Sequence, residues 1–246
     1  MEIYVCKDSK ELGEKAAQHV GRVLRECIQE KGEARIVLST GASQLDTLEA
    51  LVQEDVDWSK VEMFHLDEYV NLPETHIASF RKYLKERFIS KLNLKGAYLV
   101  DGDLSHIPAL TEKLREKVVD VGLIGIGENA HIAFNDPPAD FDTQEAYILV
   151  NLNDTCKRQQ VREGWFKTMD EVPRQAISMS VSQIMKCKRI VSCVPYTVKA
   201  KAIYDTLNSD TTNAVPATIL KEHEDFTLFL DQDSASMIAK HLSLIH

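Results

Sequence analysis

One short segment of the chain combines a histidine, two acids and a glycine-rich approach. It reads Gly125-Ile126-Gly127-Glu128-Asn129-Ala130-His131-Ile132-Ala133-Phe134-Asn135-Asp136. His131 lies between Glu128 and Asp136, and a histidine with carboxylate neighbours can be held in one tautomer and transfer protons near neutral pH. The alternative is a core histidine without a chemical role. The glycines and the flanking acids favour the catalytic interpretation. No second His or Cys follows at the spacing of a zinc site, so no metal is expected.

A second segment places two acids directly after an apolar run. Asp67 and Glu68 follow His65-Leu66 and precede a polar stretch that ends at Pro73. A carboxylate pair at the end of a strand is a candidate general base, able to take a proton from a carbon next to a carbonyl. The alternative is a solvated acidic turn.

A third segment consists of small residues between an apolar run and the start of a helix. It comprises Ser39, Thr40, Gly41, Ala42 and Ser43. Small residues let backbone N–H groups approach an anion closely, and a helix start adds positive potential. The segment is not a P-loop, because no Gly-Lys-Ser/Thr follows. The alternative is an ordinary turn in which Ser43 caps the helix.

Three cations are candidates for contact with a phosphate. Lys199 lies near the start of a predicted helix, after Pro195, and could reach a phosphate as a point charge. Arg158 and Arg162 belong to a polar segment and are further candidates. The alternatives are a surface lysine and the exposed face of a helix.

These four groups of residues must be positioned by the elements around them. Short apolar runs predict strands at 3–5, 35–38, 61–66, 98–100, 121–126, 189–194 and 226–230. Amphipathic stretches predict helices at 9–30, 45–51, 78–92, 110–118, 181–185 and 198–207, with a terminal helix after the last strand. This alternation predicts an α/β fold: a single-domain, doubly wound, mostly parallel sheet with helices on both faces, Rossmann-like, over residues 1–246. Ligands of such folds bind beyond the carboxyl ends of the strands, where all four segments meet.

Composition narrows the class of protein. The net charge of −9 argues against nonspecific nucleic-acid binding, which needs clustered Lys and Arg, but not against small phosphorylated ligands. The five cysteines are scattered and form no C-x-x-C pair, which favours reduced thiols and a cytoplasmic location. The first residues do not resemble a signal peptide, and no apolar run approaches the roughly 20 residues that span a membrane.

Taken together, the four segments resemble the glucosamine-6-phosphate deaminase/isomerase family, relatives of the 6-phosphogluconolactonases. The resemblance covers nearly the full length. The run Leu66-Asp67-Glu68-Tyr69-Val70-Asn71-Leu72-Pro73 is similar to the acidic loop of the family, and Ala130-His131-Ile132-Ala133-Phe134-Asn135-Asp136 is similar to its Gly-His-Ile-Ala-Phe-Asn-Glu. Residues 39–43 resemble its phosphate loop, and Lys199 occupies the place of its phosphate lysine.

The resemblance implies an aldose–ketose isomerisation followed by loss of ammonia from an amino-sugar phosphate. His131 would assist the opening of the sugar ring. Asp67 would take the C2 proton and return it to C1, and water would then release ammonia. The partner is a small-molecule sugar phosphate, no cofactor is called for, and a homo-oligomer is possible.

Three departures from the family pattern mark a divergent branch. Asn129 replaces the Asp two residues before the histidine, Ala130 replaces a Gly and is expected to add a Cβ beside the ligand, and Asp136 replaces a Glu. An Asn can orient an imidazole but cannot stabilise an imidazolium by charge, so Glu128 is expected to compensate. Arg158 is preferred to Arg162 as the phosphate arginine.

Two rival functions use the same residues. A 6-phosphogluconolactonase needs the histidine but no proton relay between C1 and C2. A non-catalytic sugar-phosphate sensor would keep Lys199 and residues 39–43 and lose the acid–base groups. The polar segment at 145–173, which contains Trp165 and Phe166, is a candidate lid over the site.

Overall fold

The structure, a computed structural model, describes residues 1–238 of the chain and is built on a parallel sheet. Its strands in chain order are β1 (Glu2–Cys6), β2 (Ala34–Leu38), β3 (Val61–His65), β5 (Gly96–Tyr98), β6 (Val121–Leu123), β9 (Arg189–Val194) and β10 (Phe226–Asp231). The spatial order is β1-β10-β9-β6-β2-β3-β5, and every neighbouring pair is parallel. The predicted α/β sheet is confirmed.

The direction of winding reverses between β2 and β6. From β2 the chain builds outward through β3 and β5, then returns to β6 on the other side of β2 and continues to β9 and β10. The crevice at such a reversal, at the carboxyl ends of the strands, is where doubly wound sheets bind ligands. The loops that follow β2 and β6 therefore border the expected site.

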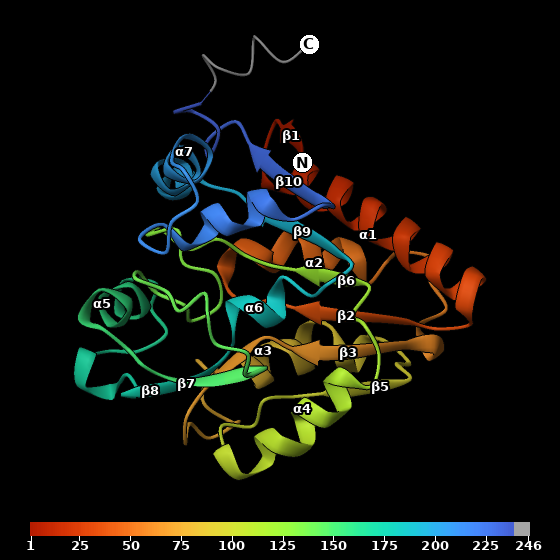
Figure 1. Cartoon of the computed structure of the whole chain (residues 1–246), viewed down its shortest axis with the longest axis horizontal. Coiled ribbons are helices and arrows are strands. Elements are labelled where there is room, and N and C mark those ends of the chain that lie inside the picture. The colour runs from red at the N-terminus through yellow and green to blue at the C-terminus, as the bar shows by residue number, and fades with distance from the viewer. Residues whose placement is uncertain (239–246) are drawn as a thin grey trace.

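Helices cover both faces of this sheet (Figure 1). One apolar core lies under α1 (Ser9–Lys31), α2 (Leu45–Leu51) and α3 (Phe80–Arg87). The other lies under α4 (Ile107–Arg115), α6 (Val181–Ile184) and α7 (Ala200–Asn208). Alternate residues of the strands feed the two cores: Val37 of β2 faces one, and Ile36 and Leu38 face the other.

The longest helix shows how the sequence specifies these elements. In α1 the buried residues Leu12, Ala16, Val20 and Leu24 recur every four residues, which gives one apolar stripe against the sheet. Asp8 caps the first turn through its side chain, which accepts a hydrogen bond from a backbone N–H.

A second, smaller sheet was not predicted. It consists of β4 (Asp67–Tyr69), β8 (Gln175–Met179) and β7 (Tyr147–Asn151), in that order, with antiparallel pairs. A small third core joins this sheet to α5 (Asp154–Arg162). The stretch after Leu66, interpreted from sequence as a loop, therefore begins with a strand that leaves the main sheet and pairs with β8.

Several predicted boundaries were wrong by a few residues. The strand predicted at 98–100 is β5, which begins earlier; α3 is shorter than predicted, α4 begins earlier and β6 ends at Leu123. Residues 232–238 form turns where a terminal helix was predicted, and the rest of that prediction lies outside the described residues. Short 3-10 helices complete the chain: η1 (Ala42–Gln44), η2 (Trp58–Lys60), η3 (Ile89–Lys91), η4 (Leu104–His106), η5 (Met169–Glu171), η6 (Thr197–Lys199) and η7 (Pro216–Glu222).

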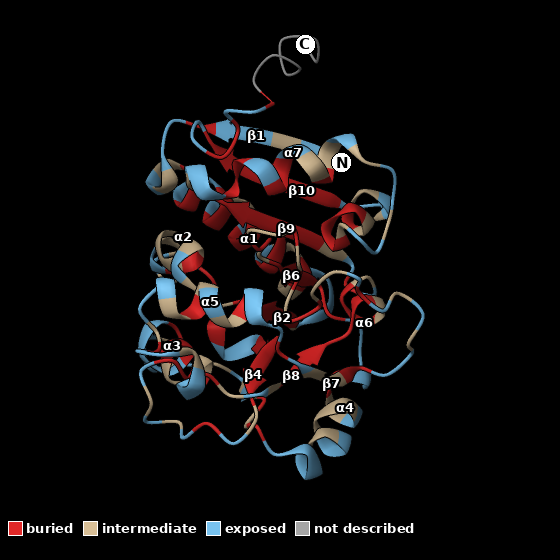
Figure 2. Cartoon of the chain, turned by 90° about the vertical axis from the view of Figure 1, so that its left-hand side faces the viewer, coloured by how far each residue is buried: buried red, intermediate tan, exposed pale blue. Residues whose placement is uncertain are grey.

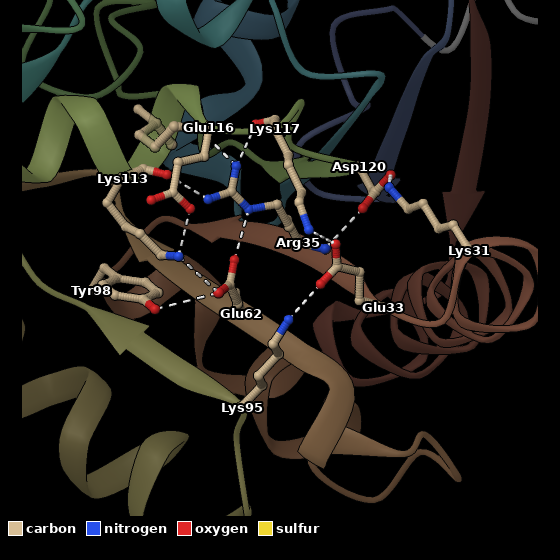
Figure 3. A network of polar contacts seen from close by, with 11 residues as sticks. Lys31, Glu33, Arg35, Glu62, Lys95, Tyr98, Lys113, Glu116, Lys117 and Asp120 are labelled. Atoms are coloured by element: carbon tan, nitrogen blue, oxygen red, sulfur yellow. Dashed lines mark hydrogen bonds and ion pairs between the residues drawn. The ribbon is translucent and has the colours of Figure 1, made fainter.

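A buried arginine ties the amino edge of the sheet to the end of α4 (Figure 3). Arg35 of β2 donates hydrogen bonds to the carbonyl oxygens of Lys113 (2.6 Å), Leu114 (2.8 Å) and Lys117. Its Nε donates to Glu62 Oε2 at 2.9 Å. The last carbonyls of a helix lack partners within the helix and carry its negative dipole end, so a guanidinium there satisfies both needs.

Within residues 1–238, no helix has the length and apolar character needed to cross a membrane.

Candidate active site

The carboxyl ends of β2, β3, β6 and β9 border one cleft of about 390 Å³. In Figure 1, β2 and β3 point towards the side where α5 lies, and Figure 2 looks onto that side. All four segments singled out in the sequence contribute to the cleft. Their lining residues include Ser39, Thr40, Gly41, Ala42, Ser43, Asp67, Glu128, His131 and Lys199.

The two adjacent acids of β4 have different surroundings because side chains alternate along a strand. The Glu68 carboxylate is fully buried and accepts hydrogen bonds from Ser79 Oγ (2.9 Å), Arg81 N (2.9 Å) and Arg81 Nε (3.2 Å). It holds the start of α3. Asp67 lines the cleft instead, so the alternative of a solvated acidic turn is wrong for both residues.

Asp67 is nearly buried and has no hydrogen bond to its carboxyl group from any residue between 1 and 238. Burial, and then the charge of Glu68, raise its pKa to about 8. A carboxyl group in this state holds a proton at neutral pH and becomes a strong base once ionised.

His131 lines the cleft and is held there by hydrogen bonds to residues behind it. Its Nδ1 is 2.5 Å from Asn129 Oδ1 and 3.3 Å from Asp136 Oδ1. Asn129 Nδ2 donates to Asp136 Oδ1 at 3.1 Å. These contacts are consistent with a proton on Nδ1 and leave Nε2 available to act as a base. Asn129 and Asp136 do not line the cleft themselves; they orient the histidine that does.

Asp136 is ionised more readily than an ordinary aspartate. Burial opposes its ionisation, but hydrogen bonding and charge from His131, and a hydrogen bond from Asn129, outweigh burial and lower its pKa. The acid partner of His131 is thus Asp136, seven residues after Asn129.

Gly127 lies directly against the imidazole. A Cβ added at this position would be 2.1 Å from Cε1 of His131. Only glycine leaves room for the ring, so this residue sets the position of the histidine.

Glu128 does not compensate for Asn129 as expected. It forms an ion pair with Arg162 of α5 rather than with His131. Its carboxylate lines the cleft and links the histidine loop to the helix across it.

The segment at 39–43 forms an open turn after β2. Ser39 N donates to Leu123 O at 3.0 Å, which joins the turn to β6. The backbone N–H groups of Thr40, Gly41 and Ala42 donate no hydrogen bond to any acceptor in residues 1–238. Gly41 has a φ of 106°, which favours glycine. Ser43 caps neither η1 nor α2, so the alternative of an ordinary capped turn is wrong.

Lys199 is a buried cation in the cleft. It is 8% exposed, forms no ion pair with any described residue, and burial lowers its pKa. Leaving an ammonium group buried without a partner is costly, so the site favours an anion at this point. The alternative of a surface lysine is wrong.

The preference for Arg158 over Arg162 is not supported by their positions. Both side chains are exposed, but Arg162 lines the cleft and Arg158 does not. The two lie one helical turn apart, and the carboxyl-terminal half of α5 is the part that faces the cleft.

Ala130 does not add a Cβ beside the ligand. Its side chain is buried in the main core and it does not line the cleft. Its φ of 63° is left-handed, a conformation that costs an alanine roughly 1–2 kcal/mol. The departure from glycine therefore affects the backbone beside His131 rather than the space for a ligand.

The sequence patterns missed most of the wall that α5 contributes to the cleft. The lining residues that were not singled out from the sequence are Phe80, Gln159, Gln160, Glu163, Tyr196 and Val198. Gln160 Oε1 accepts a hydrogen bond from Tyr69 Oη at 2.8 Å. The pair Trp165 and Phe166 was the one sequence signal for this wall, through the prediction of a lid. Part of the predicted lid is β7, which is paired into the smaller sheet.

The fold is a doubly wound α/β sheet with one cleft at its switch point. That cleft holds an acid, an oriented histidine and a group of residues that attracts anions. Together these features define a class of proteins that bind small phosphorylated molecules and can move protons on them. The chain belongs to the family of glucosamine-6-phosphate isomerases/6-phosphogluconolactonase, whose pattern it matches over residues 7–229.

Individual relatives with known names show which members of this family the chain is similar to. A glucosamine-6-phosphate deaminase of Clostridium botulinum (strain Eklund 17B / Type B) is 33% identical, over 97% of each chain. One from Lactobacillus delbrueckii subsp. bulgaricus is 34% identical, over 97% of this chain and all of that protein. A solved monomeric glucosamine-6-phosphate deaminase has a TM-score of 0.85 at 27% identity, covering 96% of this chain and 100% of its own. A 6-phosphogluconolactonase from Shewanella baltica shares the fold, with a TM-score of 0.77 at 20% identity, covering 94% of this chain and 97% of its own.

Proposed function

We propose that this chain is an amino-sugar phosphate deaminase that converts glucosamine 6-phosphate, or galactosamine 6-phosphate, into the corresponding ketose 6-phosphate and ammonia. The observation that carries the proposal is Asp67: a nearly buried carboxyl group without a hydrogen-bond partner in residues 1–238, which lines the same cleft as His131 and Lys199. The names of the relatives support the same reaction.

Binding begins at the phosphate corner. The free N–H groups of Thr40, Gly41 and Ala42 and the Lys199 ammonium group can meet a phosphate dianion. Arg162 lines the same cleft and carries a further positive charge, now paired with Glu128. Anchoring at the phosphate holds the sugar ring in the cleft, where the acid–base groups are.

Ring opening follows at His131. With Nδ1–H directed to Asn129, Nε2 can take the proton from the anomeric hydroxyl and deliver it to the ring oxygen O5 as the C1–O5 bond breaks and C1 becomes an aldehyde. Asp136 stabilises the imidazolium that forms.

Asp67 then acts on the open-chain aldehyde. Its carboxylate takes the proton from C2 while O1 gains a proton, which gives the enolamine. Asp67 then returns its proton to C1 as the nitrogen loses one, which gives the 2-imine of the ketose. Addition of one water to that imine releases one ammonia and leaves the ketose 6-phosphate. Atoms balance with no oxidant or reductant.

We also propose that residues 1–246 act as one sugar-phosphate isomerase/deaminase-like domain that works in the cytoplasm. Support comes from a main sheet whose strands run from Glu2 to Asp231, and from five unpaired, buried thiols.

The test uses three substrates. We would incubate the protein with glucosamine 6-phosphate, galactosamine 6-phosphate and 6-phosphogluconolactone, assaying ammonia from the first two and acid release from the third. We expect ammonia from at least one amino sugar. Acid release alone would indicate a lactonase, and binding without any turnover would indicate a sensor; either result contradicts the proposal.

A narrower test addresses Asp67. Asp67→Asn should abolish exchange of the C2 proton with solvent while phosphate-dependent binding is largely kept. Exchange that survives the substitution would show that Asp67 is not the base.

A further inference from the structure

We propose that Asn153 is a positioning residue that sets the protonation of His131 through Asp136 and thereby couples the lid-side helix α5 to the acid–base pair. The proposal rests on the proposed function for its kinetic consequence, but not for its test on the imidazole itself. Asn153 was not among the residues singled out in the sequence.

The amide of Asn153 bridges two parts of the molecule. Its Oδ1 accepts a hydrogen bond from Cys156 N at 2.8 Å, which caps the first turn of α5. Its Nδ2 donates to Asp136 Oδ2 at 3.2 Å. Because a backbone N–H can only donate, the cap fixes the amide oxygen towards α5, and the amide nitrogen must then face Asp136.

The two oxygens of Asp136 therefore serve different partners. Oδ1 accepts from Asn129 Nδ2 at 3.1 Å and lies 3.3 Å from His131 Nδ1, whereas Oδ2 is held by Asn153. Asn129 is itself uncharged, so Asp136 supplies the negative charge next to the imidazole. A donor on Oδ2 withdraws part of that charge and fixes the direction of the carboxylate.

Other titratable groups lie near His131 and Asp136. From α5, the Cys156 thiol is buried close to Asp136, and burial raises its pKa, so it stays neutral. Glu128 and Arg162 form a pair, and Asp67 and Lys199 line the same cleft as His131. Among the described residues, Asn153, the cap of α5, is the one that links this helix to Asp136 by a hydrogen bond.

The contact gives α5 a route to the histidine. The same helix carries Gln159, Gln160 and Arg162 into the cleft, and its last turn is tied to the histidine loop through Glu128. A substrate that shifts α5 changes the hydrogen bond on Asp136, and with it the basicity of His131.

The test distinguishes the two roles of the Asn153 amide: its oxygen caps α5, and its nitrogen donates to Asp136. Asn153→Ser and Asn153→Asp keep a good helix cap but remove the donor, and Asn153→Asp adds a negative charge beside Asp136. Asn151→Ser is the matched control, since Asn151 lies two residues away and its side chain accepts a hydrogen bond from Gln175, its one side-chain contact of this kind within residues 1–238. The imidazole of His131 would be titrated by NMR in the substrate-free protein, assigned with a His131→Gln variant.

We expect the pKa of His131 to rise by about one unit in Asn153→Asp and by less in Asn153→Ser, with no change in Asn151→Ser. The acid limb of kcat/KM should move in the same direction, with a smaller effect on KM. An unchanged His131 titration in Asn153→Asp would overturn the proposal, whatever the activity. Absence of ammonia release from the wild type would contradict the proposed function and leave the titration to decide the role of Asn153.

Discussion

At the scale of single residues, the neighbouring acids Asp67 and Glu68 have different roles. Glu68 accepts several hydrogen bonds at the start of α3, while the Asp67 carboxyl group accepts none from residues 1–238 and faces the cleft. The charge of Glu68 adds to the effect of burial on its neighbour and helps to raise the pKa of Asp67. One carboxylate stabilises the fold and also strengthens the base beside it.

The pH dependence of kcat/KM should show this raised pKa. Asp67 must lose its proton to act as a base, so kcat/KM should increase from pH 6 and level off above an apparent pKa of about 8. Loss of the Lys199 proton should bring activity down again on the alkaline side, because burial lowers the pKa of Lys199. Lys199→Arg should move that alkaline limb to higher pH. A profile flat between pH 6 and 9 would contradict the assignment.

Stability should respond to Asp67 with the opposite sign. The folded chain keeps Asp67 protonated up to about pH 8, while the unfolded chain ionises it near its ordinary pKa of 3.8. Wild-type stability therefore falls as pH rises from about 4 to 8, by up to about 5 kcal/mol for this group alone. Asp67→Asn removes that loss, so its Tm at pH 9 should exceed that of the wild type by several degrees, and the gap should close at pH 4. A lower Tm for Asp67→Asn at pH 9 would count against the burial of an unpaired carboxyl group.

Gly127→Ala tests how closely the histidine is placed. The new Cβ would come within 2.1 Å of the His131 ring, so the ring must move. A displacement of about 1 Å in an acid–base group typically costs on the order of 100-fold in rate. We expect kcat to fall by about that factor with the Tm within a few degrees of wild type. Ala133→Gly, which removes a Cβ from another lining residue, is the control. Unchanged kcat in Gly127→Ala would mean that the ring position is not critical.

At the scale of elements, the three-residue strand β4 has a large effect on the site. Its three residues leave β3, pair with β8 and turn Asp67 towards the cleft and Glu68 towards α3. Sequence patterns cannot reveal such a strand, because three polar residues show no alternation that differs from a loop. β8 also lies in a stretch to which no element was assigned from the sequence.

At the amino-terminal edge of the main sheet, the hydrogen bonds and the ion pair of Arg35 stabilise the contact between β2 and the end of α4 (Figure 3). Arg35→Met would leave the buried Glu62 carboxylate with Lys113 and Tyr98 as its partners among the described residues. It would also remove the donor from two carbonyls at the end of α4 and from that of Lys117 just after it. Breaking a buried ion pair in this way typically costs about 3–5 kcal/mol. We expect a fall in Tm of roughly 6–20 °C for a chain of this size, measured by calorimetry.

Activity well below the new Tm should be unchanged, since the network and the cleft lie at opposite edges of the sheet. Lys31→Met is the matched control: Lys31 is half exposed in its pair with Asp120, and its loss should cost about 1 kcal/mol or less. Equal effects of the two substitutions would show that burial of Arg35 contributes nothing.

At the scale of the whole molecule, the periodicity of the sequence was sufficient for the main sheet. The 23-residue amphipathic helix α1 and the apolar strands β2, β9 and β10 carry strong local patterns, and their alternation predicts parallel winding. The site followed from topology, because the carboxyl ends of parallel strands meet at one edge. The sequence was therefore sufficient to predict which four segments form the site and that they meet at one edge of the sheet.

Partnerships across the cleft were not predictable. Glu128 pairs with Arg162, 34 residues on, and no local pattern distinguishes that contact from one with His131. The choice between Arg158 and Arg162 depends on which end of α5 faces the cleft, which the smaller sheet and its aromatic core decide. Such details are set by tertiary packing rather than by local sequence.

The central claim is that this cleft deaminates an amino-sugar phosphate with Asp67 as the base. Its most direct test is ammonia release from glucosamine 6-phosphate and galactosamine 6-phosphate by the wild type and by Asp67→Asn, measured side by side at pH 8. We predict sustained release by the wild type and a loss of at least about 100-fold in Asp67→Asn, with sugar-phosphate binding retained. No ammonia from the wild type with either sugar, or equal release by both proteins, would contradict the account.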